Sequence, residues 1–568
     1  MGTAASIAAY PEAEIAHGVT TRLIPGTDYL VCLTTMEPGA MIPEETLSAE
    51  RIMIVMKGKV SQLANGVYVP MTAREYETMT PISGHRSHRD VIYLEKGVRN
   101  ALKAGNHGAE LIEVYGPART DYLSKAGISL KENSNANASV MQPSIEPNRV
   151  VNYYDLPFVP VFNGGFSRLI SGRNVQLSFL RMAPGVSFKD SRHPEEQIMI
   201  VLRGGRTETV GDNTYDMVPG DAVRIPSMMA HGAITDPTGC DVLDVYSPVR
   251  SDFYKTMGAT YVAYHEIIPE NAEVELVLDG GTEGPGICFI EGPTWLNGKL
   301  YFSSMHYDAS WNGDPEKSAL IEMDPDGSYR YISYGIMETN GTFALDNGNL
   351  AVCDTYGHRV VEIDTDGTVV RVLAGTCDGK RLDGPNDLTV DMKGGIYFTD
   401  PQILPGPYMQ PGRSVIYRKP SGETMRVVEP GVLVKPNGLI LSPDNKTLYV
   451  NSTHEDFMMA YDVNDDGSLS NGRKFGHLMI TPEFLDKESI NTQADGMTVD
   501  ERGNVYITTI LGLQIFNPDG TYIGTIHYPE MPVNCCFGGD DGKTLFATCN
   551  DKVYRIRTNV RGASYTLK

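Results

Sequence analysis

The chain has 568 residues, of which 41% are apolar, and a formal net charge of −23. This length predicts three or four domains and allows a large apolar core. The acidic balance argues against binding to nucleic-acid phosphates or to anionic membrane surfaces, because both require basic patches.

The cysteines and the apolar runs indicate the cellular setting. Eight Cys are scattered without a C-x-x-C pair, so we expect no thiolate zinc site. Residues 1–18 have neither a basic start nor a long apolar core, so they are not predicted to be a signal peptide. No apolar run approaches about 18 residues, so we expect no membrane-spanning segment. Thiols without an export signal predict a reducing, cytoplasmic setting.

Strand signals dominate the chain. Short runs of β-branched and aromatic residues recur between Asp-Gly, Asn-Gly and Gly-Gly corners, and helical periodicity is nearly absent. The first half contains an internal repeat, because residues 39–60 match residues 185–206 and residues 109–122 match residues 240–253. The first half therefore holds two copies of one β-unit, joined by the Ser/Asn/Pro-rich stretch 131–148.

A different pattern begins near residue 275. Hairpin corners such as PDG (325–327), KGG (393–395) and RGN (502–504) recur with strands between them. Regular hairpins over this length predict a β-propeller, whose blades hide their sheet edges by radial repetition. At roughly 45 to 50 residues a blade, six blades fit. The predicted all-β organisation is a first β-unit in 1–130, a linker in 131–149, a second β-unit in 150–268 and a six-bladed β-propeller in 269–568.

The second β-unit contains the segments SRHPEEQIMIVLRGG and VPGDAVRIPSMMAHGA. They resemble the two motifs of a cupin, a small barrel of the double-stranded β-helix type. The resemblance implies metal ligands at His193, Gln197 and His231, with Ser191 where the family has a further His. Two His and one Gln are able to hold a transition metal with open positions for water and substrate. The alternative is a barrel that kept polar residues without a metal.

The first β-unit resembles the same barrel but lacks the ligands. Its equivalent positions are Glu45, Leu47, Arg51 and Asn100. Since Leu and Arg do not ligate metals there, we expect the first cupin to be structural or a closed interface partner. Cupins pair readily through their sheet faces, so a homo-oligomer formed through the cupin domains is also expected.

The segment LDVYSPVRSDF adds a finer resemblance, to the cupin that linearises unsaturated uronates. The resemblance implies roles for Asp244, Tyr246 and Arg250. An acid is able to move a proton to or from an enol, and an arginine is able to hold a carboxylate through two hydrogen bonds. The alternative is an ion pair between Asp244 and Arg250 that closes the barrel rim. The first copy, which has no metal ligands, favours that alternative because it repeats the trio as Glu113, Tyr115 and Arg119.

Four carboxylate or amide side chains stand beside Gly or Pro just before predicted propeller strands. They are Glu291 in IEGPTW, Asn386 in GPNDLTV, Asn437 in KPNGLIL and Asp495 in ADGMTVD. Because the innermost strands of a propeller start near one mouth of the central channel, we expect these residues to converge. An all-oxygen set of this kind suits a hard divalent cation such as Ca²⁺, Mg²⁺ or Mn²⁺, with Zn²⁺ as a further option.

At these residues the chain resembles the gluconolactonase / senescence marker protein / luciferin-regenerating enzyme family. The resemblance covers most of residues 285–568, and the segments that carry it are EGPTW, GKRLDGPNDLTVDMKGGIYFTDP, KPNGLILSPDNKTLYV, ADGMTVDERGNVYI and VNCCFGGDDGKTLF. It implies a six-bladed propeller with one divalent metal in the channel and lactone hydrolase activity. It also implies that Glu291, Asn437 and Asp495 are metal ligands, and that Asn386 faces the substrate or a metal-bound water. Asp387 is expected to anchor its corner.

This arrangement predicts a hydrolysis without a nucleophilic Ser. The cation polarises the lactone carbonyl, and Asp495 or another nearby carboxylate accepts the proton of the attacking water. The catalytic residues are then Asp495 and Asn386. Tyr356, His358 and Asn534 are candidates for the substrate pocket, with a surface loop and a structural amide as the alternatives. Gly384 stands where some relatives have a basic residue that holds a sugar, so a sugar lactone is one option among others.

Three functions follow. The leading hypothesis is a metal-dependent lactone or ester hydrolase in the propeller, acting on a small molecule that is a lactone or resembles a sugar acid. The second is an isomerase or lyase acting on an enol or an unsaturated, uronate-like acid at the second cupin. The third is a non-catalytic scaffold that binds a metal or a ligand.

Overall fold

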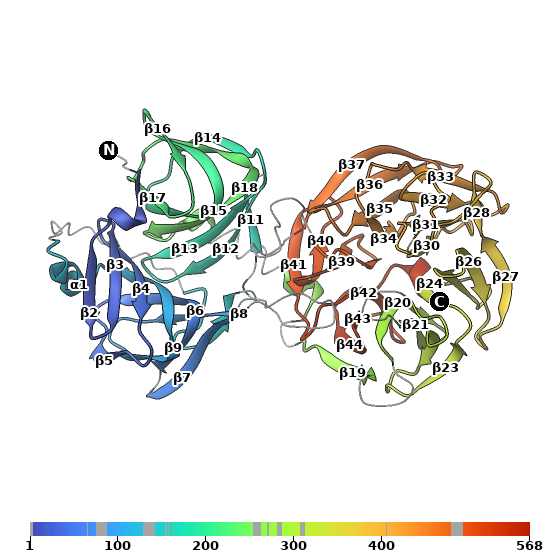
Figure 1. Ribbon diagram of the computed structural model, residues 1–568, viewed down its shortest axis with the longest axis horizontal. Coiled ribbons are helices and arrows are strands. Elements are labelled where there is room, and N and C mark those ends of the chain that lie inside the picture. The colour runs from blue at the N-terminus through green and yellow to red at the C-terminus, as the bar shows by residue number, and fades with distance from the viewer. Residues whose placement is uncertain are drawn as a thin grey trace. The chain divides into compact units, whose positions relative to one another are not determined.

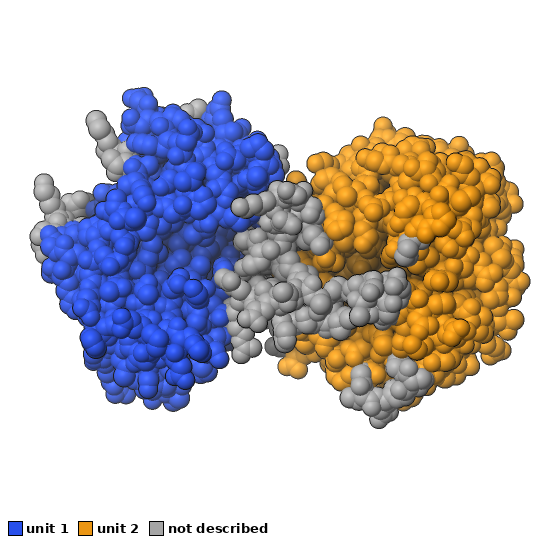
Figure 2. All heavy atoms as spheres, viewed as in Figure 1, with its two compact units in different colours: residues 1–78, 85–260 blue, residues 79–84, 261–568 orange. Residues whose placement is uncertain are grey.

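The computed structural model describes residues 4–64, 66–74, 88–128, 143–153, 156, 158–162, 164–253, 263–269, 272–280, 287–306, 313–404, 406–478 and 492–568. Among these, residues 4–253 belong to one compact unit and residues 263–568 to a second (Figure 2). The structure confirms the all-β class, with two cupin barrels followed by a six-bladed β-propeller (Figure 1). Most of the predicted linker lies outside the described residues, and the predicted domain boundaries stay a prediction.

The first barrel is a nine-stranded sheet with the order β10-β8-β7-β6-β9-β4-β3-β2, and β5 pairs with β9. Its strands are β2 (Glu12–Ala16), β3 (Val19–Pro25), β4 (Leu30–Met36), β5 (Met41–Thr46), β6 (Glu50–Ala64), β7 (Val67–Arg74), β8 (His88–Leu94), β9 (Arg99–Gly116) and β10 (Val150–Asn152). The short helix α1 (Thr120–Lys125) follows β9.

The second barrel repeats this plan with the order β1-β17-β15-β18-β13-β12-β11, while β14 pairs with β18 and β16 with β15. Its strands are β1 (Ala4–Ser6), β11 (Phe158–Phe162), β12 (Gly165–Ser171), β13 (Gln176–Met182), β14 (Ser187–Ser191), β15 (Glu196–Val210), β16 (Asn213–Met217), β17 (Asp221–Ile225) and β18 (His231–Ser247). A 3-10 turn, η1 (Ile7–Ala9), follows β1.

The sequence repeat has a structural reason in the long strands β6 and β15, which occupy equivalent positions. Each strand bends at a glycine with a positive φ, Gly58 at 79° and Gly204 at 68°. A Cβ at Gly58 would lie 2.3 Å from the carbonyl oxygen of Gly108, and one at Gly204 would lie 2.0 Å from that of Gly239. Only glycine fits this close backbone approach, so both repeats keep it.

The two barrels exchange short terminal strands and share a core. Strand β1 pairs with β17 of the second barrel, and β10 pairs with β8 of the first. One apolar cluster contains residues of both barrels, among them Ile52 and Val114 of the first and Leu177 and Leu243 of the second. This packing explains why the IMIV runs of β6 and β15 are buried on both faces, as in a sheet covered from two sides.

The second unit contains six four-stranded sheets, which are the blades of the propeller (Figure 1). From the inner strand outward, the first three blades are β20 (Phe289–Leu296), β21 (Lys299–Met305), β22 (Ala319–Met323), β23 (Tyr329–Tyr334); β24 (Thr339–Ala344), β25 (Leu350–Asp354), β26 (Arg359–Ile363), β27 (Val369–Ala374); and β30 (Leu388–Val390), β31 (Ile396–Asp400), β32 (Ser414–Arg418), β33 (Thr424–Val428). A small hairpin of β28 (Thr376–Cys377) and β29 (Lys380–Arg381) lies between the second and third blades in the chain.

The remaining blades complete the ring. They are β34 (Pro436–Leu441), β35 (Thr447–Ser452), β36 (Phe457–Val463), β37 (Leu469–His477); β38 (Met497–Val499), β39 (Val505–Thr509), β40 (Gly512–Phe516), β41 (Tyr522–Ile526); and β42 (Asn534–Gly538), β43 (Thr544–Cys549), β44 (Lys552–Arg557), β19 (Glu275–Asp279). Strand β19 precedes the first blade in the chain yet pairs with β44, so it closes the ring and covers a sheet edge. A 3-10 turn, η5 (Ser564–Thr566), lies near the end of the chain.

Two further predictions concern helices and thiols. Among the described residues, no helix has the length and apolar character that a bilayer crossing requires. All eight cysteines are free thiols, and seven of them are buried.

Candidate functional site

The inner strands of the propeller converge as the sequence predicts. A cavity of about 30 Å³ is lined from all six of them, β20, β24, β30, β34, β38 and β42. Its lining includes the polar side chains of Asp387 and Asn534. We name the polar residues at the starts of these strands the channel cluster, which comprises Glu291, Asp387, Asn437, Asp495 and Asn534.

Glu291 and Asn534 join the first and last blades. Glu291 is buried, and its Oε2 accepts hydrogen bonds from Gly292 N and from Asn534 Nδ2, both at 3.0 Å. Asn534 is fixed in turn because its Oδ1 accepts from Cys535 N at 2.8 Å. Burial raises the pKa of Glu291 to about 7, although the hydrogen bonds from Asn534 and Gly292 oppose the rise.

Asp495 and Asn437 come from neighbouring blades. Burial and the negative charge of Glu291 raise the pKa of Asp495 well above its usual value, while Lys435 and the Asn437 amide oppose the rise. The amide Nδ2 of Asn437 donates to Thr453 Oγ1 at 3.1 Å. Its Oδ1 is buried and has no hydrogen-bond partner among the described residues. Glu291, Asn437 and Asp495 are therefore brought together by the fold.

Asp387 has a larger part in the site than its corner position suggested. Its Oδ1 accepts from Leu388 N at 2.8 Å, which is the expected anchoring of the corner. Burial, followed by the charge of Glu291, raises the pKa of Asp387 to about 7, and the Asn534 side chain opposes this rise. Asp387 thus adds a third carboxyl group to the channel cluster, and its neighbour Asn386 is buried beside it.

Lys435 is a functional candidate that sequence reasoning missed. It is half-buried two residues before Asn437, and burial lowers the pKa of its ammonium group while the charge of Asp495 raises it. A lysine before a Pro-Asn-Gly corner gives no distinct signal in a single sequence. Only the fold shows that it supplies positive charge to the channel cluster.

The glycines that follow the cluster residues have a packing reason. A Cβ at Gly438 would lie 2.1 Å from the carbonyl oxygen of Asp495, and one at Gly496 would lie 2.0 Å from the Asn534 side chain. Neighbouring inner strands can approach this closely only where a side chain is absent. The Asn-Gly and Asp-Gly pairs in the sequence are therefore requirements of the channel as well as turn signals.

The channel cluster fits a divalent cation. Three buried carboxyl groups with raised pKa values share one region, and the positive charge of Lys435 opposes the rise in the pKa of Asp495. Buried carboxylates need a partner charge, and the buried Asn437 Oδ1 needs a hydrogen-bond donor or a cation. Among the described residues, no group of three or more His, Cys, Asp or Glu side chains is close enough to hold a metal on its own. A cation in the channel cluster would therefore need the Asn437 amide oxygen as one of its donors.

Tyr356 and His358 lie in the turn after β25. The neighbouring Thr355 donates its hydroxyl to the carbonyl oxygen of Pro385 at 2.7 Å, so this turn lies beside the corner that carries Asn386. Tyr356 is 51% exposed, and His358 is half-buried with a positive φ of 55°. Their role in substrate binding stays a prediction.

In the second cupin barrel, the predicted ligands lie close together. The His193 and His231 rings have centroids 4.9 Å apart, and His193 Nε2 is 3.2 Å from Gln197 Oε1. Their Nδ1 atoms face the carbonyl oxygens of Glu195 at 2.9 Å and Met229 at 3.0 Å, so both donate there. This tautomer leaves a lone pair on each Nε2, as metal ligation requires.

Two acceptors face each other in this barrel. Gln197 donates its Nε2 to Asp244 Oδ1 at 2.6 Å, which turns its Oε1 toward the lone pair of His193 Nε2. Burial lowers the pKa of His231 to about 4, so its imidazole is neutral at pH 7. Facing acceptors with a neutral imidazole nearby are the donor set that a transition metal uses. The residues present therefore fit a metal.

The barrel also holds two carboxyl groups that titrate near neutrality. Burial raises the pKa of Asp244 to about 6 and that of Glu208 to about 7, and Arg206 opposes both rises. Asp244 Oδ2 is buried and has no hydrogen-bond partner among the described residues. Arg206 and Glu208, which form a buried ion pair, gave no signal in the sequence analysis.

The proposed ion pair between Asp244 and Arg250 is wrong. Arg250 pairs instead with Asp252, with Nη2 and Oδ2 at 2.5 Å, and its guanidinium lies 5.2 Å from the centre of the Tyr246 ring. Asp244 is bonded to Gln197. Asp244 and Arg250 are six positions apart in the chain, and β18 ends between them at Ser247.

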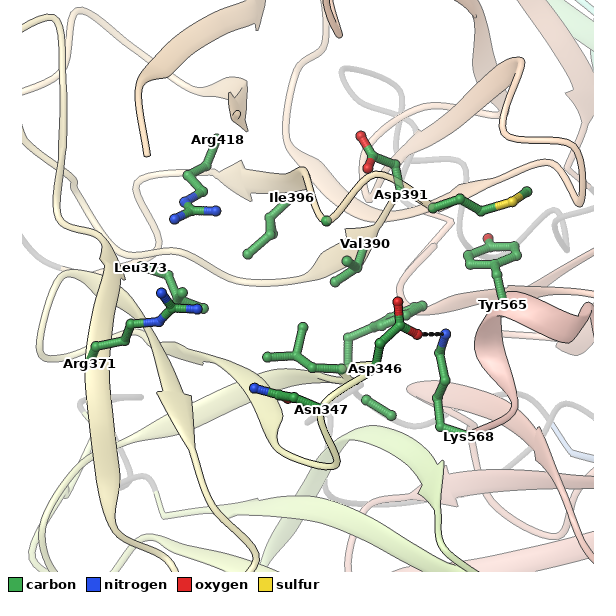
Figure 3. A pocket seen from close by; sticks show the side chains of 15 residues that line it. Asp346, Asn347, Arg371, Leu373, Val390, Asp391, Ile396, Arg418, Tyr565 and Lys568 are labelled. Carbon is green, nitrogen blue, oxygen red and sulfur yellow. Dashed lines mark hydrogen bonds and ion pairs between the residues drawn. The ribbon is translucent and has the colours of Figure 1, made fainter. Parts of the chain in front are cut away.

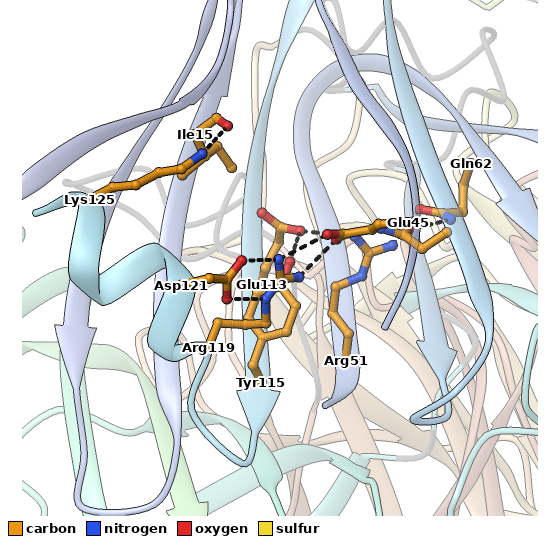
Figure 4. Close-up of polar contacts among 10 residues, drawn as sticks. Ile15, Glu45, Arg51, Gln62, Glu113, Tyr115, Arg119, Asp121 and Lys125 are labelled. Atoms are coloured by element: carbon orange, nitrogen blue, oxygen red, sulfur yellow. Dashed lines mark hydrogen bonds and ion pairs between the residues drawn. The ribbon is translucent and has the colours of Figure 1, made fainter. Parts of the chain in front are cut away.

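The first barrel shows what fills the equivalent space without a metal (Figure 4). Arg51, at the position of Gln197, donates Nη1 to Glu113 Oε1 at 3.1 Å, and both side chains are fully buried. Arg119 holds Glu45 and Asp121 through further ion pairs at 2.8 and 2.6 Å. A guanidinium thus stands in the barrel interior, which agrees with a structural role for this cupin.

Each of the two units matches a known protein family. Residues 289–550 match the protein family described as the SMP-30/Gluconolactonase/LRE-like region, and residues 178–246 match the cupin domain family. A gluconolactonase of Zymomonas mobilis is 30% identical over 296 residues, which is 49% of this chain and 80% of that protein. A diisopropyl-fluorophosphatase of Loligo vulgaris is 27% identical over 292 residues, which is 47% of this chain and 85% of that protein.

The structure of a gluconolactonase from Xanthomonas campestris is 26% identical, covers 52% of this chain and 92% of that chain, and has a TM-score of 0.44. The family match over residues 289–550 includes every member of the channel cluster, from Glu291 to Asn534.

Proposed function

Because the chain belongs to the SMP-30/gluconolactonase/LRE-like family through its propeller, we propose that the propeller is a lactonase that depends on a divalent cation in the channel cluster. Similarity to several named lactonases supports a hydrolase that opens lactones. One observation above others supports the cation. The buried Asn437 Oδ1 has no hydrogen-bond partner among the described residues, and it lies beside three carboxyl groups with raised pKa values.

Glu291, Asn437 and Asp495 are the side chains that would hold the cation. When bound, it supplies positive charge that stabilises the oxyanion developing on the lactone carbonyl. Asp495, or Asp387 beside it, accepts a proton from the water that attacks the carbonyl carbon. The ring C–O bond then breaks, and the same carboxyl group returns the proton to the released hydroxyl. The Asn386 amide orients the substrate at the mouth.

The substrate is proposed as a small lactone. Gly384 provides no side chain with which to hold a polar sugar, so the proposal includes aliphatic lactones as well as sugar lactones. Asn386, Tyr356, His358 and Asn534 are proposed to line the pocket. None of these groups is a strong nucleophile, which agrees with attack by water.

The test is cation-dependent hydrolysis by the full chain. The protein is stripped with EDTA and reloaded with Ca²⁺, Mg²⁺, Mn²⁺ or Zn²⁺ while hydrolysis of sugar and aliphatic lactones is followed. We expect activity to be lost on stripping and restored by at least one cation. Hydrolysis that stripping leaves unchanged, or no hydrolysis of any lactone, would contradict the proposal.

A matched pair of variants locates the activity. Asp495→Asn should lower kcat/KM at least ~100-fold because it removes a negatively charged ligand and a proton acceptor. Asp500→Asn is the control, because Asp500 is buried in the same blade but is hydrogen-bonded to Asn504 and Tyr506 outside the cluster. Equal losses in both variants would indicate a general effect on folding.

We also infer a second candidate activity, an isomerase or lyase at the second cupin. It is favoured by Asp244, a buried acid with a pKa of about 6 that lies beside the pair of His193 and His231. One oxygen of Asp244 has no hydrogen-bond partner among the residues that the structure describes. Such an acid is suited to moving a proton to or from an enol at neutral pH.

Reciprocal variants separate the two sites. On an unsaturated uronate, His231→Ala should abolish turnover while Asp495→Ala leaves it unchanged. On a lactone the reverse is expected. Turnover of the uronate that survives His231→Ala would remove the second candidate without affecting the first.

A further inference from the structure

A second cavity lies in the propeller between the blades of β24–β27 and β30–β33 (Figure 3). Its volume is about 400 Å³, and the turns that follow β24 and β30 form part of its wall. Asp387 of the channel cluster directly precedes β30, and Val390, which lines this cavity, ends that strand. These residues are three positions apart, about 10 Å at the usual strand rise, so the cavity and the channel cluster lie toward opposite ends of β30.

The propeller repeat shows that Arg418 is exceptional. In each blade, the first apolar residue of the second strand faces a residue near the end of the third strand, as Leu300 faces Met323 and Leu350 faces Ile363. Across the six blades, the third-strand residues at this position are Met323, Ile363, Arg418, Tyr461, Phe516 and Ile556. All except Arg418 are buried apolar or aromatic side chains. The third blade therefore replaces a core residue by an arginine that lines the cavity.

Within the described residues, Arg418 forms no salt bridge, although the Glu362 carboxylate acts on its charge at longer range. Its Nε is buried and makes no hydrogen bond within the described part of the chain. Burial and the neighbouring charge of Arg371 lower the pKa of the guanidinium, while Glu362 raises it. Arg418 is half-buried, so an anion that binds beside its guanidinium would supply the acceptor that its buried Nε lacks among the described residues.

Arg371 supplies a second cation on the same side of the cavity (Figure 3). It donates Nε to Glu362 Oε2 at 2.7 Å and makes no other hydrogen bond to a described residue. Its counterpart in the preceding blade, Arg330, donates both Nε and Nη2 to Glu322 and a further bond to Thr365 O. The terminal amino groups of Arg371 are thus left for a ligand, unlike those of Arg330.

The remaining walls are apolar or already paired. Phe343, Leu373, Val390 and Ile396 line the cavity together with the arginines. Lys568 is paired with Asp346, as the dashed line in Figure 3 shows. Asp391 accepts hydrogen bonds from Tyr417 and from two backbone amides. The side of Arg418 and Arg371 therefore carries excess positive charge, because the one carboxylate of Glu362 faces two guanidinium groups.

We propose that this cavity binds a small organic anion, whose carboxylate or phosphate group lies between Arg418 and Arg371 and whose apolar body packs against Phe343, Leu373 and Ile396. Guanidinium groups hold either oxyanion through paired hydrogen bonds, so both are suitable head groups. The site is separate from the channel cluster and does not depend on the proposed lactonase activity.

The test is calorimetric titration of the full chain with hexanoate and with hexyl phosphate at constant ionic strength set by NaCl. 1-Hexanol and inorganic phosphate are the controls for the apolar body and the head group alone. We expect one of the two amphipathic anions to bind at one site per chain, with 1-hexanol at least tenfold weaker. Comparison of the two anions identifies the preferred head group. No binding of either anion, or equal binding of 1-hexanol, would overturn the proposal.

Variants test the residues. Arg418→Met introduces the residue found at the equivalent position of the first blade, so the fold should be kept, and it should weaken anion binding at least tenfold. Arg371→Gln should weaken binding as well, and it tests the same site should Arg418→Met fail to fold. Arg330→Gln is the matched control and should bind the anion as the native chain does. The proposal would be overturned if Arg418→Met bound the anion as tightly as the native chain does. Should Arg418→Met fail to fold, native affinity in Arg371→Gln would overturn it instead.

Discussion

Asn437 shows how one side chain links the fold to the proposed chemistry. Its Nδ2 is used by Thr453 at 3.1 Å, and its buried Oδ1 is left without a partner among the described residues. A structural amide in a protein interior normally satisfies both groups. The orphaned oxygen beside Asp495 is therefore better explained by a cation than by turn formation alone.

Lys435 allows a prediction at the same scale. Its positive charge opposes the rise in the pKa of Asp495, so Lys435→Met should raise that pKa further. If Asp495 must be ionised for hydrolysis, the acidic limb of the kcat/KM profile should move to higher pH. The measurement is lactone hydrolysis from pH 5 to 9 with saturating cation.

The control for this prediction is Lys446→Met. Lys446 is exposed in the turn between β34 and β35, at the far end of the same inner hairpin. Its loss should leave the profile in place. An acidic limb that stays unmoved in Lys435→Met would contradict the assigned influence of Lys435 on Asp495.

At the scale of elements, the two cupin barrels solve one problem differently. In the first barrel a guanidinium on β6, from Arg51, neutralises Glu113 on β9. In the second, Gln197 takes the place of Arg51, and the guanidinium comes from Arg206, which pairs with Glu208 along β15. The shift of the cation leaves Asp244 with an unpartnered oxygen, and this difference separates a closed barrel from one with a polar site.

Removal of the buried cation in the first barrel should be strongly destabilising. Arg51→Met leaves the fully buried Glu113 without its ion pair. We therefore expect the free energy of unfolding of the two-barrel unit to fall by about 3 to 5 kcal/mol. The double variant with Glu113→Gln should recover most of this loss, since no unpaired charge remains. Urea unfolding, monitored through hydrogen exchange in β6, measures the free energy of unfolding of the single and the double variant.

The exposed pair of Arg99 and Glu44 is the control for the barrel prediction. Both side chains are more than half exposed, so Arg99→Met should cost less than about 1 kcal/mol. If the double variant were as unstable as Arg51→Met, the loss would be due to packing and not to the unpaired charge.

Asp400 gives a pH prediction for the corner that carries Asn386. Its two carboxylate oxygens accept from Asp383 N at 3.1 and 3.0 Å, and burial raises its pKa from 3.8 to about 7. The native state therefore holds this proton at higher pH than the unfolded chain does. The stabilising contribution is complete below about pH 4 and is lost as pH rises toward 7.

Asp400→Asn should remove this slope. Relative to the native chain, the variant should gain propeller stability between pH 5 and pH 8, by about 1 to 4 kcal/mol. Urea unfolding, monitored through hydrogen exchange in β31, gives the free energy of unfolding at each pH. The exposed turn variant Asp519→Asn serves as the control, and parallel curves for Asp400→Asn and the native chain would disprove the assigned pKa shift.

At the scale of the whole molecule, repeats made most of the architecture predictable. The shared Gly58 and Gly204 marked equivalent bends of β6 and β15, and recurring hairpin corners marked the blades. The exchanged strands β1 and β10 were not predicted, because three residues carry too little pattern to indicate a partner. Strand β19 likewise shows its role only through its pairing with β44.

The site was predictable to the extent that its residues stand in turn motifs. Glu291, Asn437 and Asp495 precede glycines that the close approach of inner strands requires, so sequence pattern and function coincide there. Lys435 and Arg418 stand outside such motifs. Their significance depends on which charges surround them in space, and a single sequence does not carry that information.

The central claim is that one divalent cation is held in the channel cluster, and crystals of the full chain soaked in Mn²⁺ test it most directly. Anomalous diffraction should show one strong peak in the propeller, at about 2.0 to 2.6 Å from oxygen atoms of Glu291, Asn437 and Asp495. A propeller channel without a peak at saturating Mn²⁺, or a peak bound elsewhere in the propeller, would contradict the account.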